Sequence, residues 1–317
     1  MIGTDTGLAA AHLKAGETVG IPTETVYGLA ANAFDENAVV SVFRIKNRPF
    51  FDPLILHVRG IEQAKQLVLE FPESAKQLAE AFWPGPLTLL LPKSELVPDI
   101  VTSGSTLVAV RVPSHPLTLE LLHHVDFPLA APSANPFGYI SPTQAEHVEK
   151  QLGDKVSYIL DGGSSEIGLE STIINCSGEK PVIARLGGLA KERIEEVLGY
   201  SIELQLNQNS NPSAPGQLDK HYAPNSRFIV TEDLEDSINR HLHEKLVVLS
   251  FGEVRIAEGI YQLNLSKTGD LSEAARNLFH YMRLLDQLSP SLIIAQRMPE
   301  FGLGLAINDR LRRASSR

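Results

Sequence analysis

Residues 17–29 read Glu-Thr-Val-Gly-Ile-Pro-Thr-Glu-Thr-Val-Tyr-Gly-Leu, a short β-prone run followed at once by a polar turn. The run at 17–21 predicts a strand. The turn gathers hydroxyl, carboxylate and phenol groups before Gly28, and it can bind a small zwitterion because loops commonly carry binding groups. The other interpretation is an ordinary strand-to-helix turn, in which Thr23 or Thr25 caps the helix and Gly28 supplies backbone freedom.

Helical and β-prone segments alternate beyond this turn. Apolar residues recur at helical spacing over residues 4–13 and 61–82. Further short β-prone runs are each bounded by Gly, Pro, Asn or Ser, so the pattern predicts one large α/β domain. Its other strands are expected at Leu87–Leu91, Leu107–Val112, Leu129–Ala131, Val156–Leu160, Ser171–Asn175 and Pro181–Arg185.

A linker is predicted at residues 205–215, where the sequence QLNQNSNPSAP carries no charge and shows no hydrophobic period. Three β-prone runs, at 227–230, 246–251 and 292–295, and an amphipathic helix at 271–288 follow it. We therefore expect three parts, namely a large α/β domain at 1–204, a linker at 205–225 and a smaller α/β domain at 226–317.

Composition excludes several classes of protein. The 317 residues include 28 Lys and Arg against 38 Asp and Glu, a formal charge of -10, so the molecule is not electrostatically suited to coat nucleic acid. Cys176 is the only cysteine, which rules out an intramolecular disulfide and a thiolate metal cluster. We find no metal-ligand motif, no secretory signal and no apolar run of roughly 18 residues, so we expect a cytoplasmic protein without a membrane span.

Cations cluster at the end of a predicted helix. Lys46 and Arg48 lie in the stretch 43–49, where Pro49 stops the helix, so both side chains can point the same way. They can bind an anion, or they can complement the negative end of the helix dipole. His57 ends a following apolar run and can hydrogen-bond a bound amino acid, although a lone histidine beside apolar residues is more often structural.

Two arginines end β-prone runs where strand alternation would place other side chains. Arg111 is followed by Val112 and Pro113, and Arg185 is followed by Leu186 and two glycines. Each is expected to face a carboxylate or a phosphate, and a structural ion pair with a protein acid is an equally good interpretation. Together they suggest a shared anion-binding floor.

Hydroxyl and amide groups gather in later turns. Ser133 and Asn135 lie on one side of the proline-bounded turn 130–136, where they can hold a phosphate or a substrate, or simply form the turn. Two further hydroxyl-bearing turns occur at 141–143 and 168–172. The chain contains no GxxxxGKS or GxxxxGKT loop, no strand-linked GxGxxG, no HExxH and no GxSxG, so a nucleotide site must use a less familiar cradle.

Seven sequence blocks lie in order between residues 22 and 224. They are PTETVYGLAANAFDE, KNRPFFDPLILHV, FWPGPLTLLLP, VAVRVPSHP, APSANPFGYISPT, GLESTIIN and APGQLDKHYAP. One such block would be weak support, whereas seven in order are highly specific. The set resembles the threonylcarbamoyl-AMP synthase (YrdC-like) family in its long, two-domain form.

The resemblance implies a fold and a reaction. The fold is α/β, with an open, twisted mixed sheet of the YrdC-like type around a basic concave cavity and a smaller, Rossmann-like C-terminal α/β domain. The reaction joins L-threonine, bicarbonate or carbon dioxide, and ATP with Mg²⁺, to give threonylcarbamoyl-adenylate and pyrophosphate, which makes the protein a nucleotidyltransferase. Partner proteins then transfer the threonylcarbamoyl group to an adenosine beside the tRNA anticodon, and direct binding of tRNA by this chain is left open.

The resemblance also implies site residues, carried over position by position. The catalytic set around the ATP phosphates is Lys46, Arg48, Ser133 and Asn135. Further nucleotide contacts are implied at Asp52, Leu107, Ser141, Arg185, His221 and Tyr222. L-Threonine is expected at Thr23, Thr25, His57, Arg111, Ala131 and Ser171, with the choice between the two threonines open.

The motif at the predicted linker departs from the family. Where many members carry Met, Lys and Tyr between PG and HY, this chain has Gln217, Leu218 and Asp219, so closure over ATP is expected to use His221 or Tyr222 differently. Two other functions fit less well. The acidic charge disfavours a double-stranded RNA-binding module, and a carbamoyl-transfer enzyme of hydrogenase maturation would be expected to bring cysteine-rich metal motifs.

Overall fold

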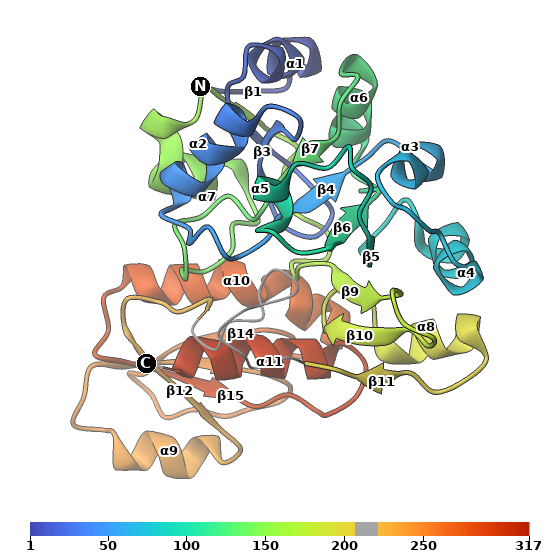
Figure 1. The fold of residues 1–317 in the computed structure, drawn as a ribbon. Helices are drawn as coiled ribbons and strands as arrows, with labels where there is room; N and C mark the ends of the chain where they lie inside the picture. The colour runs from blue at the N-terminus through green and yellow to red at the C-terminus, as the bar shows by residue number, and fades with distance from the viewer. Residues whose placement is uncertain (207–220, 317) are drawn as a thin grey trace.

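A computed structural model describes residues 1–206 and 221–316 of the protein. Within these ranges, an 11-stranded mixed sheet runs through the N-terminal part of the chain (Figure 1). Its strand β5 pairs on both sides and is buried over its first five residues, which are all leucine except Thr88. In sheet order the strands are β1 (Ile2–Gly3), β8 (Tyr158–Leu160), β2 (Val19–Ile21), β3 (Gly28–Asn32), β7 (Leu129–Ala130), β4 (Ile55–His57), β6 (Leu107–Arg111), β5 (Leu87–Pro92), β9 (Thr172–Asn175), β10 (Val182–Arg185) and β11 (Glu203–Leu204).

Helix α2 (Glu36–Lys46) shows how the sequence sets the helix ends near the site. The Asp35 carboxylate accepts the first free backbone N–H groups, and Asn47 ends the helix in a left-handed conformation with a φ of 52°. This cap turns the chain between Lys46 and Arg48, which then contact different partners. The other helices of the N-terminal part are α1 (Thr6–Lys14), α3 (Ile61–Gln66), α4 (Glu73–Phe82), α5 (Asp99–Thr102), α6 (Pro116–His124), α7 (Ala145–Leu152), the short 3₁₀ helix η1 (Gly153–Lys155) and α8 (Lys191–Leu198).

The structure corrects one predicted helix. Residues 61–82 form the two helices α3 and α4 instead of one. The first ends because Val68 pairs with Lys93 in an isolated β-bridge, and the second begins after Pro72, which has no N–H to continue a helix. The predicted strands, by contrast, are confirmed, although several are shorter than the β-prone runs that contain them.

The C-terminal part is a second sheet, all parallel, in the order β12-β15-β13-β14. Helix α10 lies between this sheet and the N-terminal part, whereas α9 lies on the far side (Figure 1). The predicted fold class, a large mixed sheet with a smaller α/β unit, is therefore confirmed. The elements are β12 (Arg227–Thr231), α9 (Leu234–Arg240), β13 (Leu246–Ser250), β14 (Tyr261–Asn264), α10 (Leu271–Gln287), β15 (Leu292–Gln296) and α11 (Leu303–Ser315).

Buried charged residues of α10 tie the two parts together. Arg283 donates hydrogen bonds to the carbonyl oxygen of Ser141, at 3.2 Å, and to that of Ile140. Asp286 accepts a hydrogen bond from the hydroxyl of Tyr139 at 2.7 Å. The loop that carries Ser141 is therefore fixed by the C-terminal part.

The predicted division of the chain stays a prediction. β11 ends at Leu204 and β12 begins at Arg227, but most of the expected linker, including Gln217, Leu218 and Asp219, lies outside the described residues. In the part of the chain that the structure describes, no helix has both the length and the apolar character needed to cross a membrane.

Cys176 lies directly after β9 and is part of the main apolar core. Burial raises the pKa of its thiol to about 12. Since the thiolate is the reactive form of cysteine, this side chain should be chemically inert near neutral pH.

Candidate functional site

A pocket lies where several strands of the large sheet end. β4 and β6 run parallel, and their register places His57 beside Arg111. Gly28, at the start of β3, pairs with Ser133 in the turn that follows β7. Segments that lie far apart in the sequence therefore meet around one small volume, as the sequence blocks predict.

Most of the predicted site residues line this pocket. Of the residues implied for the nucleotide, the lining includes Arg48, Ser133, Arg185, His221 and Tyr222. The residues implied for L-threonine all line it, namely Thr23, Thr25, His57, Arg111, Ala131 and Ser171. The structure thus brings the two predicted sets together, while their individual roles stay predictions.

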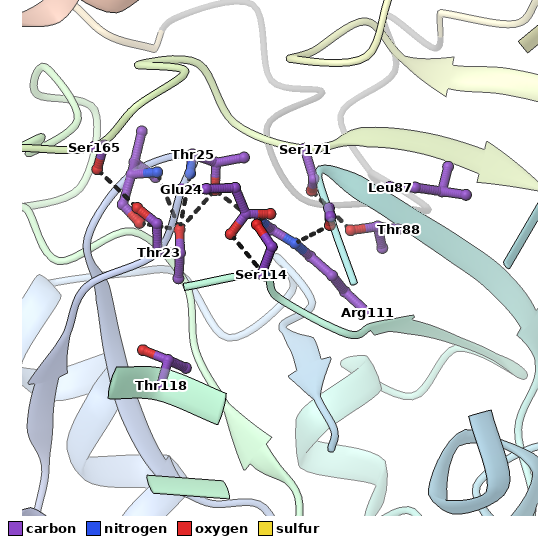
Figure 2. Close-up of polar contacts among 12 residues, drawn as sticks. Thr23, Glu24, Thr25, Leu87, Thr88, Arg111, Ser114, Thr118, Ser165 and Ser171 are labelled. Carbon is purple, nitrogen blue, oxygen red and sulfur yellow. Dashed lines mark hydrogen bonds and ion pairs between the residues drawn. The ribbon is translucent and has the colours of Figure 1, made fainter. Parts of the chain in front are cut away.

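The turn after β2 is held by its own hydroxyl groups (Figure 2). Thr23 Oγ1 donates to the carbonyl oxygen of Val26 at 2.6 Å and lies 2.7 Å from Thr25 Oγ1. Ser165 Oγ donates to the Thr23 carbonyl oxygen at 2.9 Å. The turn is therefore a preorganised unit, in which both threonine side chains are already oriented before a ligand arrives.

Arg111 faces a carboxylate, and that carboxylate belongs to the protein (Figure 2). Its Nη2 lies 2.5 Å from Glu24 Oε1, its Nη1 donates to Thr25 Oγ1 at 2.9 Å, and its Nε donates to the Gly85 carbonyl oxygen at 3.1 Å. Glu24 also accepts the backbone N–H of Ser114 at 3.1 Å. Of the two interpretations of Arg111, the structural ion pair is therefore present, with Glu24 as the partner. Arg111 also lines the pocket.

Arg185 fixes the start of β9. Its Nη2 donates to the Ser171 carbonyl oxygen at 2.8 Å and to Ser171 Oγ at 3.0 Å, and Ser171 Oγ lies 2.7 Å from Thr88 Oγ1. Gly187 permits this close packing, because a Cβ there would stand 2.3 Å from the carbonyl oxygen of Glu170. Burial lowers the pKa of Arg185 to about 10, which leaves the guanidinium charged at neutral pH.

Lys46 and Arg48 serve different parts of the site. The ammonium of Lys46 is buried and donates to the carbonyl oxygens of Ser133 and Asn135. Arg48 lines the pocket, and its Nη2 lies 2.9 Å from Asp52 Oδ2 in an ion pair whose side chains are 3% and 0% exposed. Burial, followed by the charge of Arg48, lowers the pKa of Lys46 well below its usual value.

Five of the residues implied for the nucleotide do not line the pocket, namely Lys46, Asp52, Leu107, Asn135 and Ser141. Leu107 packs against an apolar cluster at the far end of β6. Asn135 Nδ2 donates to the carbonyl oxygen of Tyr139 at 2.9 Å, and Ser141 Oγ donates to Glu170 Oε1 at 2.5 Å. Lys46, Asp52 and Ser141 contact Ser133, Arg48 and Glu170 of the pocket lining. A direct contact between the nucleotide and any of these three residues would therefore require a rearrangement.

Several buried polar atoms around the pocket lack a partner. Within the described residues, Nδ1 of His57 and Nδ1 of His221, both in the pocket lining, make no hydrogen bond, and the same holds for some buried atoms elsewhere, such as Ser250 Oγ. Buried polar atoms are usually satisfied in a folded protein, so these two ring nitrogens of the lining are candidates for hydrogen bonds to a ligand.

Three buried histidines are held neutral in the folded protein. Burial, with a smaller contribution from Arg111, lowers the pKa of His57 to about 3. Burial also lowers the pKa of His147 to about 3, and it lowers that of His221 well below 6.5. The Nδ1 of His147 accepts the backbone N–H of Thr143 at 3.2 Å, which requires the neutral ring.

We expect these histidines to make the protein less stable in mild acid. The folded pKa values lie below the unfolded value of 6.5, so below that pH only the unfolded chain gains protons. Above about pH 7 these histidines are neutral in both states, and the free energy of unfolding has its full value. As the pH falls below 6.5, protonation of the unfolded chain lowers the free energy of unfolding. Urea unfolding at about pH 5.5 and 7.5 should show a loss of about 1.4 kcal/mol per histidine, about 4 kcal/mol in all.

Two variants test this pH dependence. His147→Asn keeps an acceptor near Nδ1 but cannot titrate, so it should remove about one third of the loss. His243→Asn, at an exposed position, is the matched control and should leave the loss unchanged. Equal stability of the unaltered protein at the two pH values would contradict this account.

The predicted site residues do not include three residues that build the site. Glu24 pairs with Arg111, and Glu170 both lines the pocket and accepts Ser141 Oγ. Arg310, on α11, donates from Nε to Glu170 Oε2 at 2.9 Å. Glu24 and Glu170 lie inside the quoted sequence blocks and next to predicted site residues, so they could have been predicted. Nothing in the local sequence indicates Arg310.

The fold and the pocket define a two-part α/β protein that brings arginine side chains and hydroxyl groups together for small anionic ligands. The family described as Telomere recombination (Sua5_yciO_yrdC) matches residues 11–187, and the family described as Threonylcarbamoyl-AMP synthase, C-terminal domain, matches residues 189–316. The chain belongs to the threonylcarbamoyl-AMP synthase family.

Individual relatives cover almost the whole chain. The threonylcarbamoyl-AMP synthase of Pyrococcus abyssi is 44% identical over 97% of this chain and 93% of its own length. That of Bacillus subtilis is 40% identical over 97% of this chain and 92% of its own length. The crystal structure of P. abyssi Sua5 complexed with L-threonine matches with a TM-score of 0.91 and 42% identity, over 98% of this chain and 94% of that one.

Proposed function

We propose that this enzyme converts L-threonine, bicarbonate or carbon dioxide, and ATP into threonylcarbamoyl-AMP and pyrophosphate. The observation that carries the proposal is one pocket lined by all the residues expected to hold threonine and by five of those expected to hold the nucleotide. The family relationship supports the same reaction.

Three arginines give the pocket the charge that this reaction needs. Arg48, Arg111 and Arg185 line it, and Asp52 and Glu24 compensate part of the charge of the first two. A carbamate, a carboxylate and a triphosphate repel one another by about 1 kcal/mol per pair of unit charges at 4 Å in water, and by more in a less polar environment. Fixed cations offset this repulsion without having to reorganise during the reaction.

We place L-threonine between the turn after β2 and the ends of β4 and β6. There the hydroxyl groups of Thr25 and Ser171 and the neutral imidazole of His57 can hydrogen-bond it, since all three line the pocket. Ile55 and Ala131 add an apolar surface for the side-chain methyl group. One methyl contact of this kind discriminates against serine by about 1–3 kcal/mol.

The reaction requires alignment more than a chemical group from the protein. The threonine amine adds to carbon dioxide and loses a proton, and a carbamate oxygen then bonds to the ATP α-phosphorus as the bond to pyrophosphate breaks. Aligning two bound substrates can contribute about 7–11 kcal/mol, so no side chain needs to act as a covalent nucleophile. We place Mg²⁺ with ATP as part of the substrate, since Mg²⁺ is usually held by substrate phosphates together with one or two carboxylates.

We extend the proposal to the rest of the chain and to its partners. Residues 205–225 would form a linker that closes over the pocket, and the support is that His221 and Tyr222, near its end, line the pocket. The product would pass to threonylcarbamoyl-transferase proteins that act on tRNA in the cytoplasm. The acidic net charge of -10 gives no support for direct tRNA binding by this chain.

The purified protein should release pyrophosphate from ATP only when L-threonine and bicarbonate are both present. L-Serine should react about tenfold or more less efficiently, because it lacks the methyl group. Pyrophosphate release should be measured with each amino acid in turn, with and without bicarbonate. Release that does not depend on threonine would contradict the proposal.

Two controls separate this activity from other properties. Raising the salt concentration from about 50 to 200 mM should change the KM values little, whereas an RNA-binding protein would lose affinity steeply. Arg240→Ala removes an exposed ion pair with Asp236 on α9, far from the pocket, and should leave turnover unchanged.

A further inference from the structure

We propose that Arg310, on α11, is a positioning residue that holds two pocket-lining side chains, Glu170 and Tyr222, in place, so that the C-terminal part forms a wall of the active site. The inference rests on the proposed function, because it states that this wall of the active site contributes to the binding of ATP.

The contacts of Arg310 are the first support. Its side chain is 0% exposed, and its guanidinium is shared among acceptors from both parts of the protein. Nε donates to Glu170 Oε2 at 2.9 Å, Nη2 donates to the Leu186 carbonyl oxygen at 2.8 Å, and Nη1 lies 2.8 Å from Asp309 Oδ2. A guanidinium spreads its donors over three nitrogens in a fixed plane, whereas the three donors of a lysine ammonium share one nitrogen, so a lysine could not replace it fully.

Tyr222 is the second support, because the C-terminal part contacts it from two helices. The Arg310 guanidinium lies 5.1 Å from the centre of the Tyr222 ring, and the Phe279 ring of α10 stacks on it at 5.5 Å. The backbone of Tyr222 has a φ of 63°, a left-handed conformation that a bulky side chain rarely adopts. Such a conformation persists only where the surroundings hold it in place.

Glu170 carries the effect of Arg310 to the predicted nucleotide residues. It accepts the Ser141 hydroxyl through Oε1 while Arg310 holds Oε2, and it directly precedes Ser171, which Arg185 contacts. Without Arg310, the Glu170 carboxylate would keep the hydrogen bond from Ser141 and the more distant charge of Arg185, but would lose its direct ion pair. Because a buried carboxylate needs a charged or well-bonded partner, Glu170 should then turn away and displace Ser141.

Stability alone does not account for this arrangement. Replacing a buried ion pair with apolar side chains often leaves the stability of a protein unchanged or raises it. The buried ion pair of Arg310 is therefore poorly explained as a means of stabilising the contact between the two parts. The guanidinium here ends on two residues of the pocket lining. The geometry therefore favours a role in shaping the site.

Arg310→Met and Arg310→Lys test the inference in the full-length protein. In threonine-dependent pyrophosphate release, Arg310→Met should raise the KM for ATP about tenfold or more, with the KM for L-threonine changed less than about threefold. Arg310→Lys should recover part of the loss, because its amine can still pair with Glu170. Hydrogen exchange should become faster at residues 139–143 and 168–172 in Arg310→Met, a readout that needs no substrate.

Glu170→Gln and Arg276→Met complete the test. Because Arg310 acts partly through Glu170, adding Arg310→Met to Glu170→Gln should raise the KM for ATP less than Arg310→Met does alone, and the remaining rise reports the contact with Tyr222. Arg276→Met removes another contact between the two parts, an exposed hydrogen bond to the Glu166 carbonyl oxygen, and should leave KM and hydrogen exchange unchanged. If Arg310→Met does not fold, Arg310→Lys and Glu170→Gln carry the comparison.

Two results would overturn the inference. One is an unchanged KM for ATP together with unchanged hydrogen exchange at the pocket segments. The other is an equal rise in both KM values with additive effects of the two substitutions, which would indicate general destabilisation. If the unaltered protein shows no threonine-dependent release, the proposed function fails, and the hydrogen exchange still decides whether Arg310 positions the pocket.

Discussion

Replacing Lys46 with methionine should lower kcat/KM for threonine-dependent pyrophosphate release about 100-fold or more, a loss of about 2.7 kcal/mol in transition-state stabilisation. The buried ammonium donates to the carbonyl oxygens of Ser133 and Asn135, so it joins the end of α2 to the turn that carries pocket-lining Ser133. Methionine fills the space but leaves the Asn135 carbonyl oxygen unpaired within the described residues, at about 1–3 kcal/mol, while the Ser133 carbonyl oxygen keeps only the backbone N–H of Asn135 at 3.1 Å. The turn should then shift away from the substrates.

The control for Lys46→Met is Lys65→Met. Lys65 is 44% exposed and pairs with Glu62 on the surface of α3, an interaction of little energetic value. Its loss should change neither kinetics nor stability. Steady-state kinetics and urea unfolding should be measured on both variants, and a Lys46→Met protein with kcat/KM within about threefold of normal would contradict the role given to Lys46.

Glu24→Gln should be among the most destabilising substitutions near the pocket, with a loss of about 3–5 kcal/mol in the free energy of unfolding. Both side chains of the Glu24–Arg111 pair are 4% exposed, so the substitution leaves the Arg111 charge buried without its counter-charge. Thermal and urea unfolding measure the effect, which should appear as a fall in Tm of about 10 °C or more.

A double variant separates the ion pair from the shape of the site. In Glu24→Gln/Arg111→Met no charge is left unpaired, so this protein should be more stable than Glu24→Gln alone. Glu62→Gln breaks an exposed pair and should cost less than about 1 kcal/mol. A loss below about 1 kcal/mol for Glu24→Gln itself would show that the pair is not needed to compensate the buried arginine.

The strand cores could be predicted from the sequence because they are local and continuous. β5 lies in the apolar run that predicts it, and β6 ends at the arginine that interrupts the alternation. The break between α3 and α4 could not be predicted from spacing alone, since Val68 leaves the helix to pair with Lys93 across the fold. Two-residue strands such as β1 and β11 carry too few side chains to show a period.

The pocket was predictable as a set of residues, but not in its internal contacts. Arg111 was expected to meet an anion, and the sequence could not indicate that Glu24 already contacts it. Lys46 was expected to face the substrates, yet it donates to backbone carbonyl oxygens, which every residue carries and no pattern reveals. Arg310 reaches Glu170 from 140 positions away, so only the folded chain brings them together.

The buried position of Cys176 gives the protein a practical property. Its only cysteine should not react with maleimide reagents, because the thiol is buried and its pKa is raised to about 12. Two substitutions at exposed positions, Glu70→Cys in the N-terminal part and Ser291→Cys in the C-terminal part, would introduce the only reactive thiols. The natural chain is thus a ready background for a pair of fluorescent dyes that reports the separation of the two parts during turnover.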